Sequence, residues 1–380
     1  MKIAYLSTFY PFRGGIAQFN ASLYRVLEKN HSIKAYTFTR QYPESLFPGS
    51  SQYASSSDKT DKIPSIKLLD SVNPISYYRT AVKITQFNPD LLITKFWMPF
   101  FAPSLGTVSK NLKKKNTINI SILDNVIPHE KRVGDINLTK YFLNQQDGFI
   151  VMSDTVKNDL IKLKPNAVYQ EHPHPIYDHF SNSTNKSDAR NKLGIPPEKK
   201  VLLFFGFIRD YKGLDILLKA MKVLPIEYHL IIAGEVYGNF QKYEDLISRL
   251  DISSKISKFV RYINDDEVPS FFSAADVCVL PYKSATQSGI VGISYQYNLP
   301  VIATNVGSLK EMIEPYKTGL IVDDPDYMKI SDAVIKYFKD GMNLNYPANI
   351  ENYKNKYNWE NLANTIINLH SQLSLEIKLK

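Results

Sequence analysis

Two cationic side chains follow one of the most apolar segments of this 380-residue chain. The segment VLLFFGFI (201–208) leads to Arg209 and Lys212 in GFIRDYKGLDILL, where a helical pattern begins. Two cations beside a helix N-terminus can neutralise a diphosphate without a metal ion. The alternative is a pair of solvated loop charges, which the spacing alone does not exclude.

A second candidate anion site follows the apolar segment ADVCVLPY (275–282). Backbone N–H groups and hydroxyls at the start of a helix are suited to bind anions. If both segments are strands of one parallel sheet, both loops reach the crevice beyond its carboxyl edge. Two anion-binding loops in one domain predict a site for a nucleotide diphosphate. The second loop consists of Thr286, Gln287, Ser288 and Gly289, which lead into a helical stretch.

A glycine pair, Gly14 and Gly15, follows the first apolar segment of the chain. Such a pair lets backbone N–H groups approach an anion, or it simply forms a turn. It does not match G-x-G-x-x-G, which disfavours a nicotinamide or flavin enzyme. The sequence also lacks H-E-x-x-H, a His/Cys cluster, G-x-S-x-G and a P-loop, so hydrolase and kinase chemistry have little support.

Short apolar runs alternate with longer amphipathic stretches along most of the chain, which is typical of βαβ units and parallel sheets. The predicted fold class is α/β, with two doubly wound domains. The polar stretch 181–199 predicts a linker between domains 1–180 and 200–356, and 357–380 predicts a helix that packs back toward the first domain. Residues 41–66 are expected to form a long loop. The runs expected as strands are 2–7, 32–38, 90–96, 118–124, 148–152, 167–172, 200–206, 228–235, 257–263, 276–282, 300–304 and 318–323.

Positive charge is concentrated in the first half of the chain. The formal net charge is +9, and residues 1–200 carry 27 Lys and Arg against 16 Asp and Glu, whereas residues 201–380 carry 19 against 21. The basic half predicts an anionic partner, such as a membrane surface or a pyrophosphate-linked substrate. Nucleic acid is disfavoured because no nucleic-acid-binding signature is present. The densest cluster, interpreted as a membrane contact or a solvated helix end, is Lys110, Lys113, Lys114 and Lys115.

The cellular compartment is inferred from two further features. A single cysteine, Cys278, excludes an internal disulfide framework. The apolar runs are far shorter than the roughly 18 residues of a membrane span. We expect a cytoplasmic protein, peripheral at the inner face of the membrane.

Taken in order, the motifs resemble those of retaining glycosyltransferases of family 4, which have two Rossmann-like domains facing across a cleft (the GT-B fold). The resemblance covers nearly the full chain and includes a late tryptophan-containing helix at Trp359. The motifs that carry it are the glycine pair, HPHPIYDHF (172–180), FFGFIRDYKGLDILL, LIIAGEVYGN, ADVCVLPYKSATQSG, LPVIATNVGSLKEMI and TGLIVDD.

The resemblance implies a retaining, metal-independent hexosyltransferase that needs no cofactor. Its donor is a nucleotide-diphospho-sugar bound by the C-terminal domain. Its acceptor, a glycan or a lipid-pyrophosphate-linked sugar, binds mainly to the N-terminal domain, in surface polysaccharide or glycoconjugate biosynthesis. Arg209 and Lys212 are expected to hold the diphosphate and stabilise its leaving charge. The implied substrate-binding residues are Gly14, Gly15, Asn125, His129, Gly206, Glu235, Tyr262, Ile263, Tyr282, Thr286, Gln287, Ser288, Gly289, Ile290 and Glu311.

The chain departs from the family pattern at its acidic and histidine positions. Many members carry two Glu residues separated by seven others, but Ala285 and Ile293 stand there in this TQSG-type variant. Glu311 is the nearest downstream acid and either substitutes in part or starts a helix. Asp124 occupies the place of a frequent His. We expect it in the catalytic pocket, because a carboxylate can accept a proton from an acceptor hydroxyl.

Two residues of an earlier segment are further candidates. Lys95 and Trp97, in TKFWMPF, are candidates to line the acceptor side, with a packed Trp as the alternative.

Two alternatives to the enzyme interpretation stay open. The missing acids also fit a catalytically degenerate partner or binding subunit that keeps the fold. The anion sites also fit a sugar-nucleotide epimerase, although the sequence shows no evident acid/base carboxylate set for one. The sequence does not identify the donor sugar, the nucleotide, the acceptor or the oligomeric state.

Overall fold

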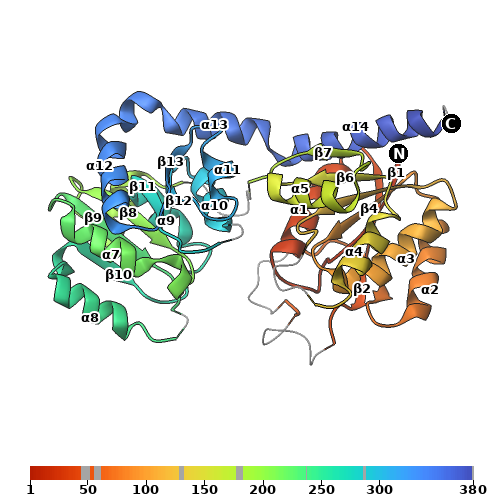
Figure 1. Cartoon of the computed structure of the whole chain (residues 1–380), viewed down its shortest axis with the longest axis horizontal. Helices are drawn as coiled ribbons and strands as arrows, with labels where there is room; N and C mark the ends of the chain where they lie inside the picture. Colours follow the sequence, from red (N-terminus) through yellow and green to blue (C-terminus); the bar gives the residue numbers. More distant parts are fainter. Residues whose placement is uncertain are drawn as a thin grey trace. The chain divides into compact units, whose positions relative to one another are not determined.

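The computed structural model describes residues 1–43, 52–54, 61–127, 132–176, 183–236, 238–285 and 288–378. The chain forms two compact units, of which the first comprises Met1–His174 and Trp359–Lys380 and the second Pro175–Asn358 (Figure 1). Among the described residues, no helix combines the length and the apolar character that a bilayer crossing requires.

The first unit contains a seven-stranded parallel sheet. Its strand order is β3-β2-β1-β4-β5-β6-β7, so the direction in which strands are added reverses between β1 and β4. Two of these strands, LLITKF and INISIL, are buried at every position because helices cover both faces of the sheet. The strands are β1 (Lys2–Leu6), β2 (Ser32–Arg40), β3 (Ser65–Asp70), β4 (Leu91–Phe96), β5 (Ile118–Leu123), β6 (Gly148–Val151) and β7 (Tyr169–Glu171).

Two groups of helices enclose this sheet. Helix α2 packs on α3 and α3 on α4, whereas α1 packs on α14, the last helix of the chain. A Cβ atom added at Gly148 in β6 would lie 2.8 Å from the Leu373 side chain of α14, so glycine permits the close approach of this helix. The helices are α1 (Gly15–Glu28), α2 (Pro74–Thr85), α3 (Ala102–Lys113), α4 (Asp135–Leu143), α5 (Asp154–Leu163) and α14 (Trp359–Lys378).

The second unit contains a six-stranded parallel sheet in the order β10-β9-β8-β11-β12-β13. It repeats the doubly wound topology of the first unit, and the direction in which strands are added reverses between β8 and β11. The predicted fold class, α/β with two doubly wound parallel sheets, is confirmed. The strands are β8 (Lys200–Phe205), β9 (Tyr228–Ala233), β10 (Ile256–Phe259), β11 (Val277–Leu280), β12 (Val301–Thr304) and β13 (Gly319–Val322).

Helices cover both faces of the second sheet as well. One core lies under α7, α8 and α12, and the other under α6, α9, α10, α11 and α13. The helices are α6 (Lys186–Leu193), α7 (Leu214–Val223), α8 (Gln241–Leu250), α9 (Val268–Ala274), α10 (Gly289–Gln296), α11 (Leu309–Ile313), α12 (Tyr327–Leu344) and α13 (Tyr346–Lys356).

The interval 181–199, expected as a linker, contains helix α6. This helix buries only Ala189 and Arg190, which explains its polar sequence. The Arg190 guanidinium donates to the carbonyl of Ala274 at 3.0 Å and to the Asp276 carboxylate at 2.8 Å, so α6 is bonded into the second unit. The division between the units therefore falls after His174 rather than within the polar stretch.

Candidate functional site

The loop after β8 is held tightly against the loop after β11. Gly213, at the N-terminus of α7, has φ of +70°, and a Cβ atom there would lie 1.9 Å from the carbonyl oxygen of Pro281. Only glycine satisfies both the left-handed backbone and the contact. The short 3₁₀ helix Asp210–Lys212 precedes Gly213, and Arg209 is its N-terminal flanking residue. This packing fixes the two predicted diphosphate ligands at the carboxyl edge of the sheet.

Lys212 is a buried cation in this loop, with 8% of its surface exposed. Its Nζ atom lies 5.7 Å from the centre of the Tyr282 ring, and a Cβ atom at Gly206 would be 3.2 Å from it. Burial, and secondarily the positive charge of Arg209, lower the pKa of Lys212 to about 8. Among the described residues, no carboxylate pairs with this ammonium. A buried cation without a counter-charge is suited to receive an anionic ligand.

The N-terminus of α10 lies beside the same cation. Ser288 caps this helix by accepting a hydrogen bond from the backbone N–H of Ile290 at 3.3 Å, and its hydroxyl lies 3.2 Å from that of Tyr282. A Cβ atom at Gly206 would lie 3.2 Å from Ile290 Cδ1, and φ at Gly206 is +97°. Gly289 opens the helix, and a Cβ atom there would meet nothing within 4 Å. The structure thus brings together Gly206, Lys212, Tyr282, Ser288, Gly289 and Ile290.

Four other predicted residues of this unit occupy different surroundings. The backbone carbonyl of Glu235, which follows β9, accepts from Ile208 N–H at 2.8 Å, so this loop lies beside that of Arg209. Tyr262 is 62% exposed, whereas Ile263 is buried in the core. Glu311 lies in the first turn of α11. Thr286 and Gln287 lie outside the described residues.

The glycine pair of the first unit starts helix α1. Gly14 is the N-cap residue with φ of +103°, and its carbonyl accepts from the N–H of Gln18 at 3.1 Å. Gly15 is the first residue of the helix. A Cβ atom at Gly14 would meet nothing within 4 Å, so the backbone conformation, rather than a close contact, requires glycine there.

Asp124 follows β5 and forms an ion pair with Lys95 in β4. The Lys95 Nζ atom lies 2.6 Å from Asp124 Oδ1, and the side chains are 2% and 22% exposed. The same ammonium lies 3.6 Å from the centre of the Phe19 ring. Burial lowers the pKa of Lys95, and the charge of Asp124 partly offsets this effect. Sequence reasoning placed Lys95 near the acceptor but missed this pair, which only the neighbouring register of β4 and β5 reveals.

The surroundings of this ion pair are closely packed. Burial, and then the charge of Asp124, raise the pKa of Tyr5 well above its ordinary value. The Tyr5 hydroxyl donates to Asn20 Oδ1 at 2.6 Å. Asn125 follows Asp124 directly and is half-buried, and His129 lies outside the described residues. Trp97 is packed among aromatic residues and donates to the Tyr42 hydroxyl at 3.0 Å.

The chain is similar in sequence to known glycosyltransferases. Residues 185–357 match the sequence model of the family described as Glycosyl transferases group 1. The chain is 30% identical over 197 residues to D-inositol 3-phosphate glycosyltransferase from Corynebacterium urealyticum, which covers 49% of this chain and 46% of that protein. It is 23% identical over 214 residues to the lipopolysaccharide core biosynthesis mannosyltransferase LpsB from Rhizobium meliloti, which covers 53% and 58%. These matches span about half of the length of the relatives.

Solved structures match along almost the whole chain. A glycosyltransferase from Rickettsia africae has a TM-score of 0.73 at 16% identity, covering 98% of both chains. The Anabaena protein Alr3699/HepE in complex with UDP has a TM-score of 0.68 at 14% identity, covering 100% of both. The fold is therefore that of GT-B glycosyltransferases, and residues 185–357 of the second unit are similar to the glycosyl transferases group 1 family.

Proposed function

We propose that this protein is a retaining glycosyltransferase that transfers a hexosyl residue from a nucleotide-diphospho-sugar to a glycan or lipid-linked acceptor. The observation that carries the proposal is the buried ammonium of Lys212, which lies beside Arg209 and the N-terminus of α10. The two cations and the helix N-terminus lie close together at the carboxyl edge of the sheet. A diphosphate is the ligand that fits this concentration of positive charge best.

In the proposed reaction the bond between the anomeric carbon and the diphosphate oxygen breaks, and its electron pair passes to the leaving diphosphate. Arg209 and Lys212 stabilise this developing negative charge. No metal ion takes part in the proposed reaction. A hydroxyl oxygen of the acceptor forms the new bond to the anomeric carbon on the face from which the diphosphate leaves, and the proton of that hydroxyl passes to the departing diphosphate oxygen. The similarity to HepE, whose structure holds UDP, supports a nucleotide as the donor's leaving group.

The acceptor side of the proposal rests on the first unit. Lys95 holds one oxygen of Asp124, and the second oxygen is left to accept a hydrogen bond from an acceptor hydroxyl. In this role Asp124 orients the acceptor. The relationship to LpsB supports a glycan or glycolipid acceptor in surface polysaccharide biosynthesis.

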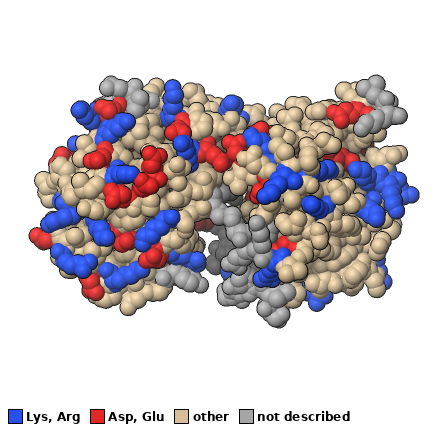
Figure 2. Space-filling view, viewed as in Figure 1, with Lys and Arg blue, Asp and Glu red and all other residues tan. Residues whose placement is uncertain are grey.

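We also propose that the first unit binds an anionic membrane surface through helix α2. Ile75, Tyr78 and Val82 are 62%, 58% and 62% exposed. They follow helical spacing, and Arg79 and Lys83 line a shallow hollow with Tyr78 and Val82. Helix α3, which ends in the basic cluster Lys110–Lys115, packs against α2. Figure 2 shows Lys and Arg side chains gathered on the side of the unit where these helices lie.

The transfer reaction is tested by Arg209→Ala with UDP-, GDP- and ADP-sugars in the presence of chelator. We expect the variant to lose at least about a hundredfold in turnover, the magnitude typical of lost electrostatic stabilisation. The matched control is Lys242→Ala, which removes an exposed cation of α8. Lys242 pairs with Asp210, the residue that follows Arg209. Equal, near-zero rates in wild type and Arg209→Ala across all donors would contradict the proposal. Proton NMR of the product's anomeric coupling tests retention.

A further inference from the structure

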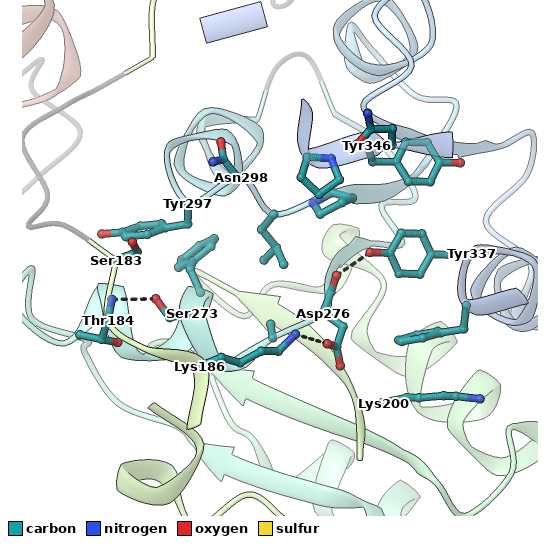
Figure 3. Close-up of a pocket in the computed structure, with 17 residues that line it drawn as sticks. Ser183, Thr184, Lys186, Lys200, Ser273, Asp276, Tyr297, Asn298, Tyr337 and Tyr346 are labelled. Carbon is teal, nitrogen blue, oxygen red and sulfur yellow. Dashed lines mark hydrogen bonds and ion pairs between the residues drawn. The ribbon is translucent and has the colours of Figure 1, made fainter. Parts of the chain in front are cut away.

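A cavity of about 740 Å³ lies in the second unit at the amino edge of its sheet (Figure 3). Lys200 begins β8, Asp276 precedes β11 and Pro300 precedes β12, and all three line the cavity. The candidate diphosphate residues follow the opposite ends of these strands. A six-residue strand spans about 17 Å, so the cavity is separate from the candidate transfer site.

Aromatic rings form much of the cavity wall. Tyr297 stacks on Phe272, with centroids 5.4 Å apart and an interplanar angle of 25°. Tyr337 stacks on Tyr346, with centroids 5.7 Å apart and an angle of 18°. In Figure 3 the ring of Tyr297 lies on one side of the cavity and those of Tyr337 and Tyr346 lie on the other. Because Phe272 and Tyr346 are 1% and 2% exposed, the half-buried Tyr297 and Tyr337 are the members of these pairs that a ligand in the cavity can reach.

Neutral polar groups lie on the side of the cavity where Tyr297 is found (Figure 3). Thr184 and Ser273 come from adjacent walls, where the Thr184 N–H donates to the Ser273 hydroxyl at 3.2 Å. Asn298 is exposed at the rim and adopts φ of +53°. The hydroxyls of Thr184 and Ser273 can donate and accept hydrogen bonds with a ligand that carries many hydroxyls. The Asn298 amide adds a polar group at the rim, and its Oδ1 already accepts from Lys354 Nζ at 3.1 Å.

The cations of the cavity already face carboxylates. Lys186 forms an ion pair with Asp276, and Lys200 Nζ lies 3.6 Å from Glu227. The Asp276 carboxylate also accepts from Arg190 at 2.8 Å and from the N–H of Val201 at 2.7 Å. Each lysine of the lining therefore already faces a carboxylate, in contrast to Lys212. A phosphate ligand is disfavoured here because each of these two lysines would have to exchange an existing counter-charge for it.

We infer that this cavity is a second saccharide site, which binds neutral sugar residues of a glycan. Aromatic faces cover the apolar C–H faces of a pyranose, and the neutral polar groups bind its hydroxyls. A volume of about 740 Å³ falls within the usual range for small-ligand pockets. The site holds a glycan away from the transfer site, a role that rests on the proposed function, whereas saccharide binding itself does not.

The test measures saccharide binding to the full chain by saturation-transfer difference NMR. The probes are glucose, galactose, mannose, N-acetylglucosamine, maltose, cellobiose and lactose, with inorganic pyrophosphate as an anion probe. The main variant is Tyr297→Ala, which removes one ring of the wall. The matched control is Tyr327→Ala, an exposed tyrosine of the same unit outside the cavity. Circular dichroism checks that each variant is folded.

We expect at least one saccharide to bind, with affinity reduced tenfold or more in Tyr297→Ala and unchanged in Tyr327→Ala. Asn298→Gly is a second variant in case Tyr297→Ala does not fold, because glycine adopts the left-handed conformation at this position without strain. It should weaken the same saccharide threefold or more. Binding should persist in Arg209→Ala, even if that variant and the wild type show no transfer activity.

Three results would overturn the inference. They are no saccharide binding to the wild-type chain, equal binding to the wild type and to the folded cavity variants, and binding that is lost only in Arg209→Ala. Pyrophosphate binding that is weakened by Tyr297→Ala, without saccharide binding, would show instead that the cavity is an anion site.

Discussion

The ammonium of Lys95 and the carboxylate of Asp124 form an ion pair of 2.6 Å at the carboxyl edge of the first sheet. The two residues come from neighbouring parallel strands and differ sharply in exposure, because the lysine is 2% and the aspartate 22% exposed. The pair is therefore asymmetric. Water can reach Asp124 if its partner is lost, but Lys95 has no comparable access to solvent.

This asymmetry predicts unequal effects on stability. Asp124→Asn leaves a buried ammonium without its counter-charge and should lower the free energy of unfolding by about 3–5 kcal/mol. Lys95→Met leaves a partly solvated carboxylate and should cost less than about 2 kcal/mol. Urea denaturation at pH 7 measures both. A larger loss in Lys95→Met than in Asp124→Asn would show that the burial of Lys95 does not control the energetics of the pair.

The pH dependence of the Asp124→Asn variant follows from the same contact. Burial lowers the pKa of Lys95, and removal of the Asp124 charge lowers it further. The unfolded chain then binds a proton that the folded chain does not, over the pH range between the folded pKa and 10.5. The stability of this variant should rise with pH across that range more steeply than that of the wild type. Parallel pH profiles of the two proteins would contradict this expectation.

The lowered pKa of Lys212 predicts how pH affects nucleotide binding. Its pKa in the ligand-free protein is about 8, and the protonated form is the one that attracts a diphosphate. The dissociation constant should therefore rise by up to about tenfold for each pH unit above 8. Titration calorimetry with UDP, GDP and ADP between pH 7.5 and 9.5 measures this, and proton uptake should accompany binding at pH 8.5. Lys212→Arg should abolish the pH step, because arginine stays protonated throughout.

The contact at Gly213 predicts a specific loss of stability. Gly213→Ala would place a Cβ atom 1.9 Å from the Pro281 carbonyl oxygen at φ of +70°. Gly194 has φ of +67° with nothing within 4 Å of its added Cβ atom, so Gly194→Ala measures backbone strain alone, about 1–2 kcal/mol. Gly213→Ala should cost more than this control and should also weaken nucleotide binding. Equal unfolding free energies of the two variants would show that the Pro281 contact relaxes freely.

The exposed apolar side chains of α2 predict membrane binding that depends on anionic lipid. The wild-type chain should float with vesicles that contain phosphatidylglycerol more than with phosphatidylcholine alone, and salt should weaken the binding. Replacing Ile75, Tyr78 and Val82 by serine should reduce it severalfold. The matched control replaces Val223 and Ile226, which are 45% and 60% exposed in the second unit. Similar losses in both variants would argue against a contact specific to α2.

The architecture was predictable because strands buried on both faces form apolar runs that the sequence displays directly. Strand β3 (Ser65–Asp70) was missed because its sequence, SIKLLD, is not a continuous apolar run. The strand lies at the edge of the sheet and is only partly buried. Helix α6 was missed because it buries only two residues, one of them an arginine. In both cases the tertiary position, not the local sequence, determines the structure.

The candidate site was predictable to the extent that its residues follow strand ends. Lys212, Ser288 and Gly206 meet because two loops share one edge of a parallel sheet. The ion pair of Lys95 was not predictable, because Lys95 and Asp124 are 29 positions apart and the segment between them gives no local signal. The cavity at the opposite edge combines residues from four helices and three strand starts, which no sequence pattern connects.

The helix that completes the first unit, α14, is separated in the sequence from the rest of that unit by the whole second unit. The first unit needs Trp359–Lys378 to cover the face of its sheet near Gly148, yet the whole second unit is synthesised in between. The second unit can therefore acquire its native core during translation while the first still exposes an apolar surface. A chain shortened before Trp359 would keep a foldable second unit and lose a stable first one.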